Sequence, residues 1–230
     1  MSIVKGHRIE TNQVSFSDVK TNDNGGKTIY MNYNKGMFKV QTPVMTLPYD
    51  MSCYDKGDYP KYSLDVAFRD LDSDYRVKGF HDNMSQLEQF ILGQALENSK
   101  KWFAKTHKSL DVLSALFTPL VKKSIDRETG EPDGRYADTM KFKLPVRDGR
   151  PGFDITDFED KPLKDAELAS MLTKESKVQA ILRCGGIWII AGKFGCTWRA
   201  EQMKVKPVTN FDEYAFDDSD EEEVEKIDEN

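Results

Sequence analysis

The sequence predicts a mostly β protein, an antiparallel sheet or barrel with inserted helices and an acidic C-terminal tail. Two segments, KYSLDVAFRD and TMKFKLPV, alternate apolar and polar residues with the period of a half-buried strand. The predicted strands and helices do not follow the regular βαβ order of a parallel sheet. The 230 residues are enough for one hydrophobic core, and we expect one domain over residues 1–210.

Two hairpins are expected, one near each end of this domain. The segment TIYMNY is rich in β-forming residues, and Asn34-Lys35-Gly36 after it predicts a turn into a second strand. Near the C-terminus, two long strand-like segments flank GKFG (192–195), which predicts a four-residue loop with glycine at both ends. Such a loop would present Phe194 to solvent.

Helices are expected in the middle of the chain. Ser85 and Glu88 have the spacing of a capping box ahead of apolar residues at helical intervals, which predicts a helix over 84–106. A shorter helix is predicted over 109–117. Because Gly79 precedes the helical pattern, we expect the change from strand to helix to occur after it.

The charge is divided unevenly along the chain. Residues 211–230 hold 11 acidic residues and one basic residue, so residues 1–210 keep 28 of the 39 acidic and 32 of the 33 basic residues. A mildly basic body therefore carries a tail with a net charge of −10. Dense like charge with little apolar surface to bury predicts that this tail is disordered.

Patterns for catalysis, metal binding and membrane insertion are not found. The three histidines and three cysteines have no zinc-site spacing, and the chain carries neither a nucleophile elbow nor a dinucleotide fingerprint. An acidic segment that begins at Asp70 resembles a calcium loop, but Tyr75 and His81 occupy its glycine and glutamate positions. No apolar stretch is long enough for a membrane span, and the N-terminus lacks the apolar core of a signal peptide. We therefore expect an intracellular protein without a cofactor and without enzymatic activity.

Basic residues interleaved with aromatic ones are the remaining signal. Cations that follow phosphates and flat rings that stack on unpaired bases are the means by which proteins hold single-stranded nucleic acid. Each residue also has a structural alternative, because the aromatic rings could belong to the core and the lysines to an ordinary solvated face. The candidate DNA-binding residues are Lys100, Lys101, Arg135, Tyr136, Lys141, Lys143, Trp188, Lys193, Phe194, Trp198, Arg199 and Lys204.

Two stretches carry a family resemblance. They are FTPLVKKSIDRETGE with RYADTMKFKLPVRDG (117–149) and SKVQAILRCGGIWIIAGKFGCTWRAEQMKVKP (176–207). Both resemble the single-stranded DNA-binding proteins of nucleocytoplasmic large DNA viruses, which are related to the replicative binding protein of the T-seven type of phage. The resemblance implies an oligonucleotide-binding (OB) barrel over 1–210 and dimerisation. It also implies a tail over 211–230 that contacts replication proteins, although the phage relatives end in an aromatic residue and this chain ends in Asn230.

The expected function is therefore binding of single-stranded DNA without sequence preference, in support of viral DNA replication, recombination or repair. The tail would compete with DNA for the basic body and would recruit replication proteins such as a polymerase or a primase-helicase. The protein would act inside a host cell, in the cytoplasm or the nucleus where viral DNA is replicated. Two alternatives remain, a virion-associated structural protein and an acidic-tailed, chaperone-like interaction protein.

Overall fold

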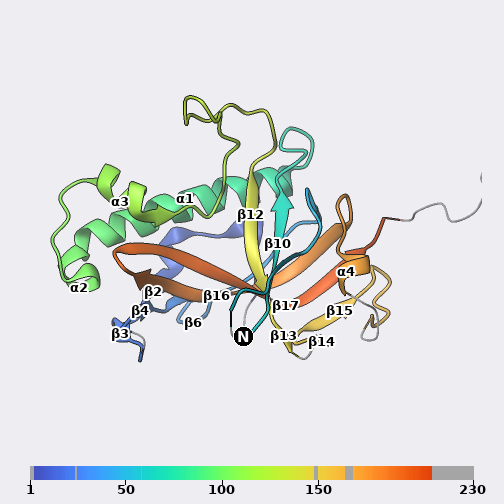
Figure 1. The fold of residues 1–230 in the computed structure, drawn as a ribbon, viewed down its shortest axis with the longest axis horizontal. Helices are drawn as coiled ribbons and strands as arrows, with labels where there is room; N and C mark the ends of the chain where they lie inside the picture. Colours follow the sequence, from blue (N-terminus) through green and yellow to red (C-terminus); the bar gives the residue numbers. More distant parts are fainter. Residues whose placement is uncertain (1–2, 24, 58, 148–149, 164–167, 209–230) are drawn as a thin grey trace, which may run out of the picture.

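The computed structural model describes residues 3–23, 25–57, 59–147, 150–163 and 168–208 (Figure 1). The acidic tail predicted over 211–230 lies outside these residues. None of the helices in the described part combines the length and the apolar character that a membrane crossing requires.

Five strands close into a ring. Four neighbouring pairs are antiparallel, and β12 and β17 are parallel. This arrangement confirms the predicted mostly β fold with inserted helices. It is an OB-fold-like barrel, and its five strands occur along the chain in the order β8, β10, β12, β16 and β17. The ring strands are β8 (Met45–Thr46), β10 (Lys61–Ala67), β12 (Thr139–Leu144), β16 (Lys177–Ile190) and β17 (Lys193–Lys206).

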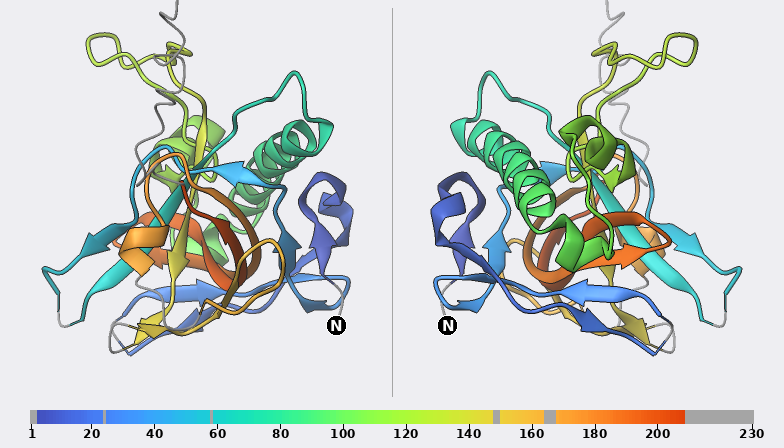
Figure 2. Two further views of the ribbon diagram at one scale, coloured as in Figure 1. Left: turned by 90° about the vertical axis from the view of Figure 1, so that its right-hand side faces the viewer. Right: turned by 90° about the vertical axis from the view of Figure 1, so that its left-hand side faces the viewer.

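Shorter elements surround the ring. In Figure 2 the β9–β10 hairpin and the long loop before β12 project away from the barrel. The remaining strands are β1 (Val4–Lys5), β2 (Val14–Phe16), β3 (Lys20–Thr21), β4 (Lys27–Ile29), β5 (Met31–Tyr33), β6 (Gly36–Met37), β7 (Lys39–Gln41), β9 (Ser52–Tyr54), β11 (Phe117–Thr118), β13 (Val146–Arg147), β14 (Arg150–Pro151) and β15 (Asp154–Thr156). The helical elements are the 3-10 turns η1 (Gly6–Arg8) and η2 (Thr11–Gln13) and the helices α1 (Tyr75–Glu97), α2 (Ser99–Phe103), α3 (Leu110–Leu116) and α4 (Leu168–Met171).

The long helix α1 begins earlier than predicted and lies along one side of the barrel (Figure 1). Asp74 caps it by accepting a hydrogen bond from the backbone N–H of Arg76, at 2.8 Å. Gly79 lies inside the helix, where the close packing of η1 leaves no room for a side chain; a Cβ at this position would stand 2.8 Å from the Cβ of His7. The prediction of a start near residue 84 was wrong because this contact is not visible in the local sequence.

Glu88 lies in the middle of α1 and does not cap the N-terminus of the helix. Its carboxylate instead accepts the backbone N–H of Leu120 at 2.7 Å, which ties α1 to the segment that enters the β11–β12 loop. Burial raises the pKa of Glu88, and the backbone N–H groups of Leu120 and Val121 oppose that shift. The shorter predicted helix is confirmed as α3, which is capped by Ser109.

The C-terminal hairpin has a tighter turn than predicted. Ala191 and Gly192, with φ angles of 49° and 81°, form a two-residue turn that matches the twist of the strands. Phe194 is therefore a strand residue paired with Ile189, and its side chain is 0% exposed. The predicted loop over 192–195, with Phe194 facing solvent, was wrong. The early hairpin is confirmed, with Asn34 and Lys35 at the turn between β5 and β6.

Candidate nucleic-acid interface

A groove of about 390 Å³ runs over the outer face of β10 and β12. The β9–β10 hairpin borders it on one side, and the segment after β11 together with the β16–β17 hairpin borders it on the other. Phe142 and Trp198 also line the groove, but their side chains face the core and are almost fully buried. We refer to this site as the groove, and its polar and aromatic walls come from Tyr54, Lys61, Tyr62, Ser63, Lys122, Lys141, Lys143, Trp188 and Thr197.

The strand register explains why cations line the groove. On β12 the apolar Met140, Phe142 and Leu144 face the core, so that Lys141 and Lys143 face outward, as the alternation in TMKFKLPV predicted. Ser63 lies opposite Lys143 on the neighbouring strand β10.

Positive charge is concentrated at one point of the groove. Lys143 lies directly opposite Arg199 of β17. Partial desolvation lowers the pKa of Lys143, and the positive charges of Arg199 and Lys61 lower it further. Within the described part of the chain, no carboxylate forms an ion pair with any of these three cations, whereas Lys141 is paired with Asp65 at 3.1 Å. Like charges placed opposite each other destabilise a sheet, so this cluster is suited to an anionic ligand.

Aromatic rings stand beside these cations. Tyr54 lies opposite Lys61 in the β9–β10 hairpin, and its side chain is 54% exposed. Tyr62 and Trp188 are half-buried in the groove walls. The indole of Trp188 covers Gly195 so closely that a Cβ on this glycine would lie 2.8 Å from the ring. The glycine therefore gives Trp188 its place beside the groove, and the groove offers both cations and partly accessible rings.

Five of the predicted residues meet in or beside the groove. Lys141, Lys143, Trp188 and the buried Trp198 line it, and Arg199 adjoins Lys143 through the strand pairing.

Two predicted stacking residues belong to the core instead. Phe194 packs against Phe103 and Phe117, with ring centroids 5.1 and 4.9 Å apart. Trp198 is 2% exposed and packs edge-to-face on Phe38. Phe194 does not line the groove, and Trp198 lines it with a ring that points inward and is too buried to stack on a base. The expectation that these two residues stack on bases is corrected accordingly.

Other predicted residues lie outside the groove lining. Lys100 and Lys101 are exposed on α2, and Lys101 forms an ion pair with Asp18 at 2.8 Å. Lys204 pairs with Asp160 at the edge of a separate cavity. Arg135 and Tyr136 are exposed on the loop before β12, and Lys193 is exposed at the start of β17.

The sequence analysis missed Tyr54, Lys61, Tyr62 and Lys122. For Lys61 a signal was present, because the alternation of KYSLDVAFRD places it on the polar face of its strand. Tyr54 and Lys122 join the groove through pairings of β9 with β10 and of Lys122 with Thr139, which no local pattern indicates.

Comparisons with known proteins complete this description. No family model matches the chain, and no curated protein matches it either. Among solved structures, the single-stranded DNA-binding protein of bacteriophage Enc34 in complex with single-stranded DNA is similar, with 13% identity and a TM-score of 0.45 over 84% of this chain and 96% of that one. The bacteriophage T7 single-stranded DNA-binding protein gp2.5 is also similar, with 16% identity and a TM-score of 0.45 over 84% of this chain and 100% of that one.

Proposed function

We propose that the protein binds single-stranded DNA in the groove, without sequence preference and without turnover. The observation that carries this proposal is the cluster of Lys61, Lys143 and Arg199, which have no acidic partner among the residues that the structure describes and stand next to Tyr54 and Trp188. Cations can hold the phosphates while the rings stack on bases, and each stacked base contributes about 1–3 kcal/mol. The groove also lies on the second and third strands of the barrel, the face on which OB folds bind oligonucleotides.

We also propose that the protein acts on viral DNA. The resemblance of residues 117–149 and 176–207 supports a role in viral DNA replication, recombination or repair inside a host cell. It also supports the assignment to large DNA viruses and formation of a homodimer. We propose that the acidic segment 211–230, with its net charge of −10, competes with DNA for the body and recruits replication proteins such as a polymerase or a primase-helicase.

A salt titration tests DNA binding. We expect the full chain to bind oligo-dT more tightly than a duplex, because stacking in the groove requires unpaired bases. Four phosphates held by Lys61, Lys122, Lys143 and Arg199 would give a log–log salt slope of about −3 on single strands. A slope near zero, or equal affinity for both DNA forms, would contradict the proposal.

The same titration with a chain that ends at residue 210 tests the tail. Twenty residues of disordered chain would span about 25 Å on average, so a tethered acidic segment with the disorder that its charge predicts would reach cations on the body. Its removal should tighten oligo-dT binding at about 50 mM salt, and the gain should shrink at about 200 mM because the longer-range attraction is screened. Equal affinities of the two chains at low salt would show that the segment does not compete with DNA.

A further inference from the structure

Four cations form a line across four neighbouring strands, and only two of them belong to the cluster described above. Lys143 of β12 lies opposite Arg199 of β17, Arg199 lies opposite Arg183 of β16, and Arg183 lies opposite Lys39 of β7. Directly paired residues point to the same side of a sheet, and the buried neighbours Leu182 and Val40 point inward. All four cations therefore lie on the outer face. We refer to them as the cation row, which at about 4.8 Å per strand is about 14 Å long.

The cation row keeps an excess of positive charge. Glu201 pairs with both Lys39, at 2.5 Å, and Arg183, at 3.1 Å. This single carboxylate thus forms ion pairs with two cations and holds them in place. Lys143 and Arg199 have no acidic partner among the described residues. A line of like charges opposite each other weakens a sheet unless an anion lies along it.

The cation row leads to a second pocket. Gln41 is the next outward residue after Lys39 on β7, and Lys5 of β1 lies opposite Gln41. Together with Arg8, Arg76 and other residues they line a pocket of about 230 Å³, which we call the Lys5 pocket.

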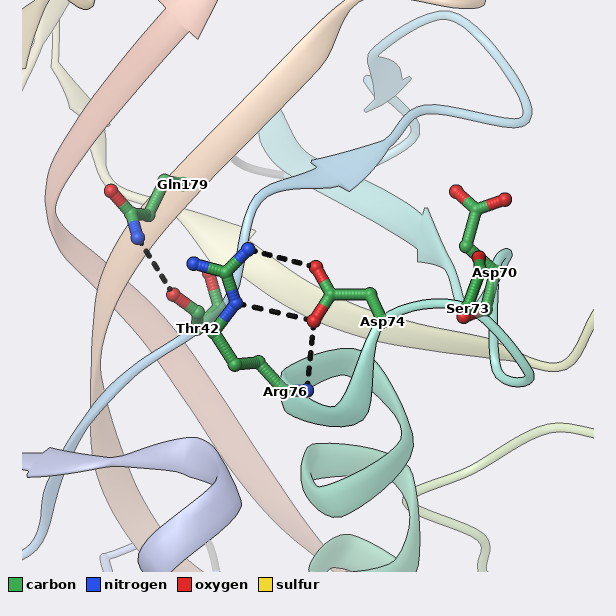
Figure 3. Close-up of polar contacts among 6 residues, drawn as sticks. All are labelled: Thr42, Asp70, Ser73, Asp74, Arg76 and Gln179. Atoms are coloured by element: carbon green, nitrogen blue, oxygen red, sulfur yellow. Dashed lines mark hydrogen bonds and ion pairs between the residues drawn. The ribbon is translucent and has the colours of Figure 1, made fainter.

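The β16 edge and the start of α1 complete the Lys5 pocket. Figure 3 shows Gln179 of β16, whose side-chain amide donates to the backbone carbonyl of Thr42 at 3.2 Å, and Arg76 at the start of α1, held by Asp74. Gln179, Thr42 and Arg76 all line the pocket. Arg76 is therefore positioned by its ion pair, and it faces the same space as the amide of Gln179.

The charges around the Lys5 pocket act on one another. Burial lowers the pKa of His7, the positive charges of Arg8, Lys5 and Arg76 lower it further, and Asp74 opposes them. The ring of Tyr75, which is 74% exposed, packs edge-to-face against His7 with centroids 5.7 Å apart. The pocket is thus lined by three cations, Lys5, Arg8 and Arg76, and by the accessible ring of Tyr75, so that it combines cations with an aromatic ring as the groove does.

We infer that the DNA strand bound in the groove continues along the cation row and places a phosphate in the Lys5 pocket. The inference rests on the proposed function, because it extends the path of the same ligand. Continuity supports it: each outward cation from Lys143 to Lys39 is the direct strand partner of the previous one, and Lys5 follows one strand later. A short oligonucleotide would occupy the groove alone, and a long one would reach both sites.

The test compares two lengths of oligo-dT on the full chain and on the variant Lys5→Gln/Arg8→Gln. OB folds cover about 4–16 nucleotides, so lengths of about 4 and about 16 bracket the two cases. We expect unchanged affinity for the short oligonucleotide. For the long one, we expect the affinity at about 50 mM salt to fall roughly tenfold for each phosphate contact removed. This value follows from a log–log salt slope of about −0.7 per contact, if a contact contributes nothing to affinity at about 1 M salt.

Controls separate the possible failures. Lys105→Gln/Lys108→Gln removes an equal charge from the exposed loop between α2 and α3, and it should not change the advantage of the long oligonucleotide. If the unmodified chain does not bind the short oligonucleotide, the proposed function fails. If it does, and Lys5→Gln/Arg8→Gln leaves long-oligonucleotide affinity unchanged, the inference fails.

The acidic segment 211–230 is the other candidate occupant of the Lys5 pocket, because its carboxylates could bind the pocket cations. A chain that ends at residue 210 tests this alternative. If DNA occupies the pocket, the effect of Lys5→Gln/Arg8→Gln on the long oligonucleotide persists in the shorter chain. If the effect disappears, the acidic segment is the occupant and the inference is overturned.

Discussion

Phe194→Ala is expected to lower the free energy of unfolding by about 3–5 kcal/mol, the usual cost of truncating a buried phenylalanine. Its ring is 0% exposed and packs between Phe103 and Phe117 next to the turn of the β16–β17 hairpin. The cavity left by the ring would be lined by these two rigid rings, which cannot easily collapse into it. Chemical denaturation followed by circular dichroism measures this loss.

The matched control is Tyr54→Ala, which removes an exposed aromatic residue from the groove wall. It should change stability by less than about 0.5 kcal/mol, as surface substitutions usually do, and should weaken oligo-dT binding by about 1–3 kcal/mol. Phe194→Ala should show the opposite pattern while it remains folded. Normal stability combined with weak DNA binding in Phe194→Ala would mean that this ring stacks on a base after all.

The double change Lys143→Gln/Arg199→Gln should weaken DNA binding without weakening the fold. Two lost phosphate contacts would make the salt slope shallower by about 1.4 and reduce affinity by between about tenfold and a hundredfold at about 50 mM salt. Removing two like charges that lie opposite each other should leave stability equal or raise it, by up to about 1 kcal/mol. Fluorescence anisotropy of a labelled oligo-dT and thermal unfolding measure the two effects.

Lys105→Gln/Lys108→Gln is the charge control for this pair as well, because both lysines lie outside the groove and the cation row. An equal loss of affinity in Lys105→Gln/Lys108→Gln would mean that only the total charge matters. A large loss of stability in the double variant would mean that the two cations support the fold, and the groove would lose its strongest evidence.

Local patterns predicted the strands that build the groove. Alternation placed Leu64 and Phe142 inward and Lys141 and Lys143 outward, and the register of β10 and β12 agrees with it. Alternation works here because each strand has one buried and one solvated face, and a shift by one residue would expose the whole apolar set. The short helix α3 lies within the helix predicted over 109–117, and the structure shows that Ser109 caps it.

Features that depend on distant contacts were not predictable in this way. Gly79 lies inside α1 where η1 packs closely on it, and the burial of Phe194 follows from a turn that is two residues long. The groove itself joins Tyr54, Lys122 and Trp188 from separate segments. A single sequence shows which residues could bind DNA, but the pairing of strands decides which of them share a face.

Tryptophan fluorescence during titration with oligo-dT tests the central claim, that DNA lies in the groove, most directly. The chain has three tryptophans; Trp102 and Trp198 are 3% and 2% exposed, whereas Trp188 is half-buried and lines the groove. Stacking on a base should quench Trp188 alone. We therefore expect quenching in the unmodified chain and its loss in Trp188→Phe, whose phenyl ring keeps most of the affinity as measured by anisotropy. Binding without quenching in the unmodified chain, or quenching of the same size in Trp188→Phe, would contradict the stacking of DNA on Trp188 in the groove.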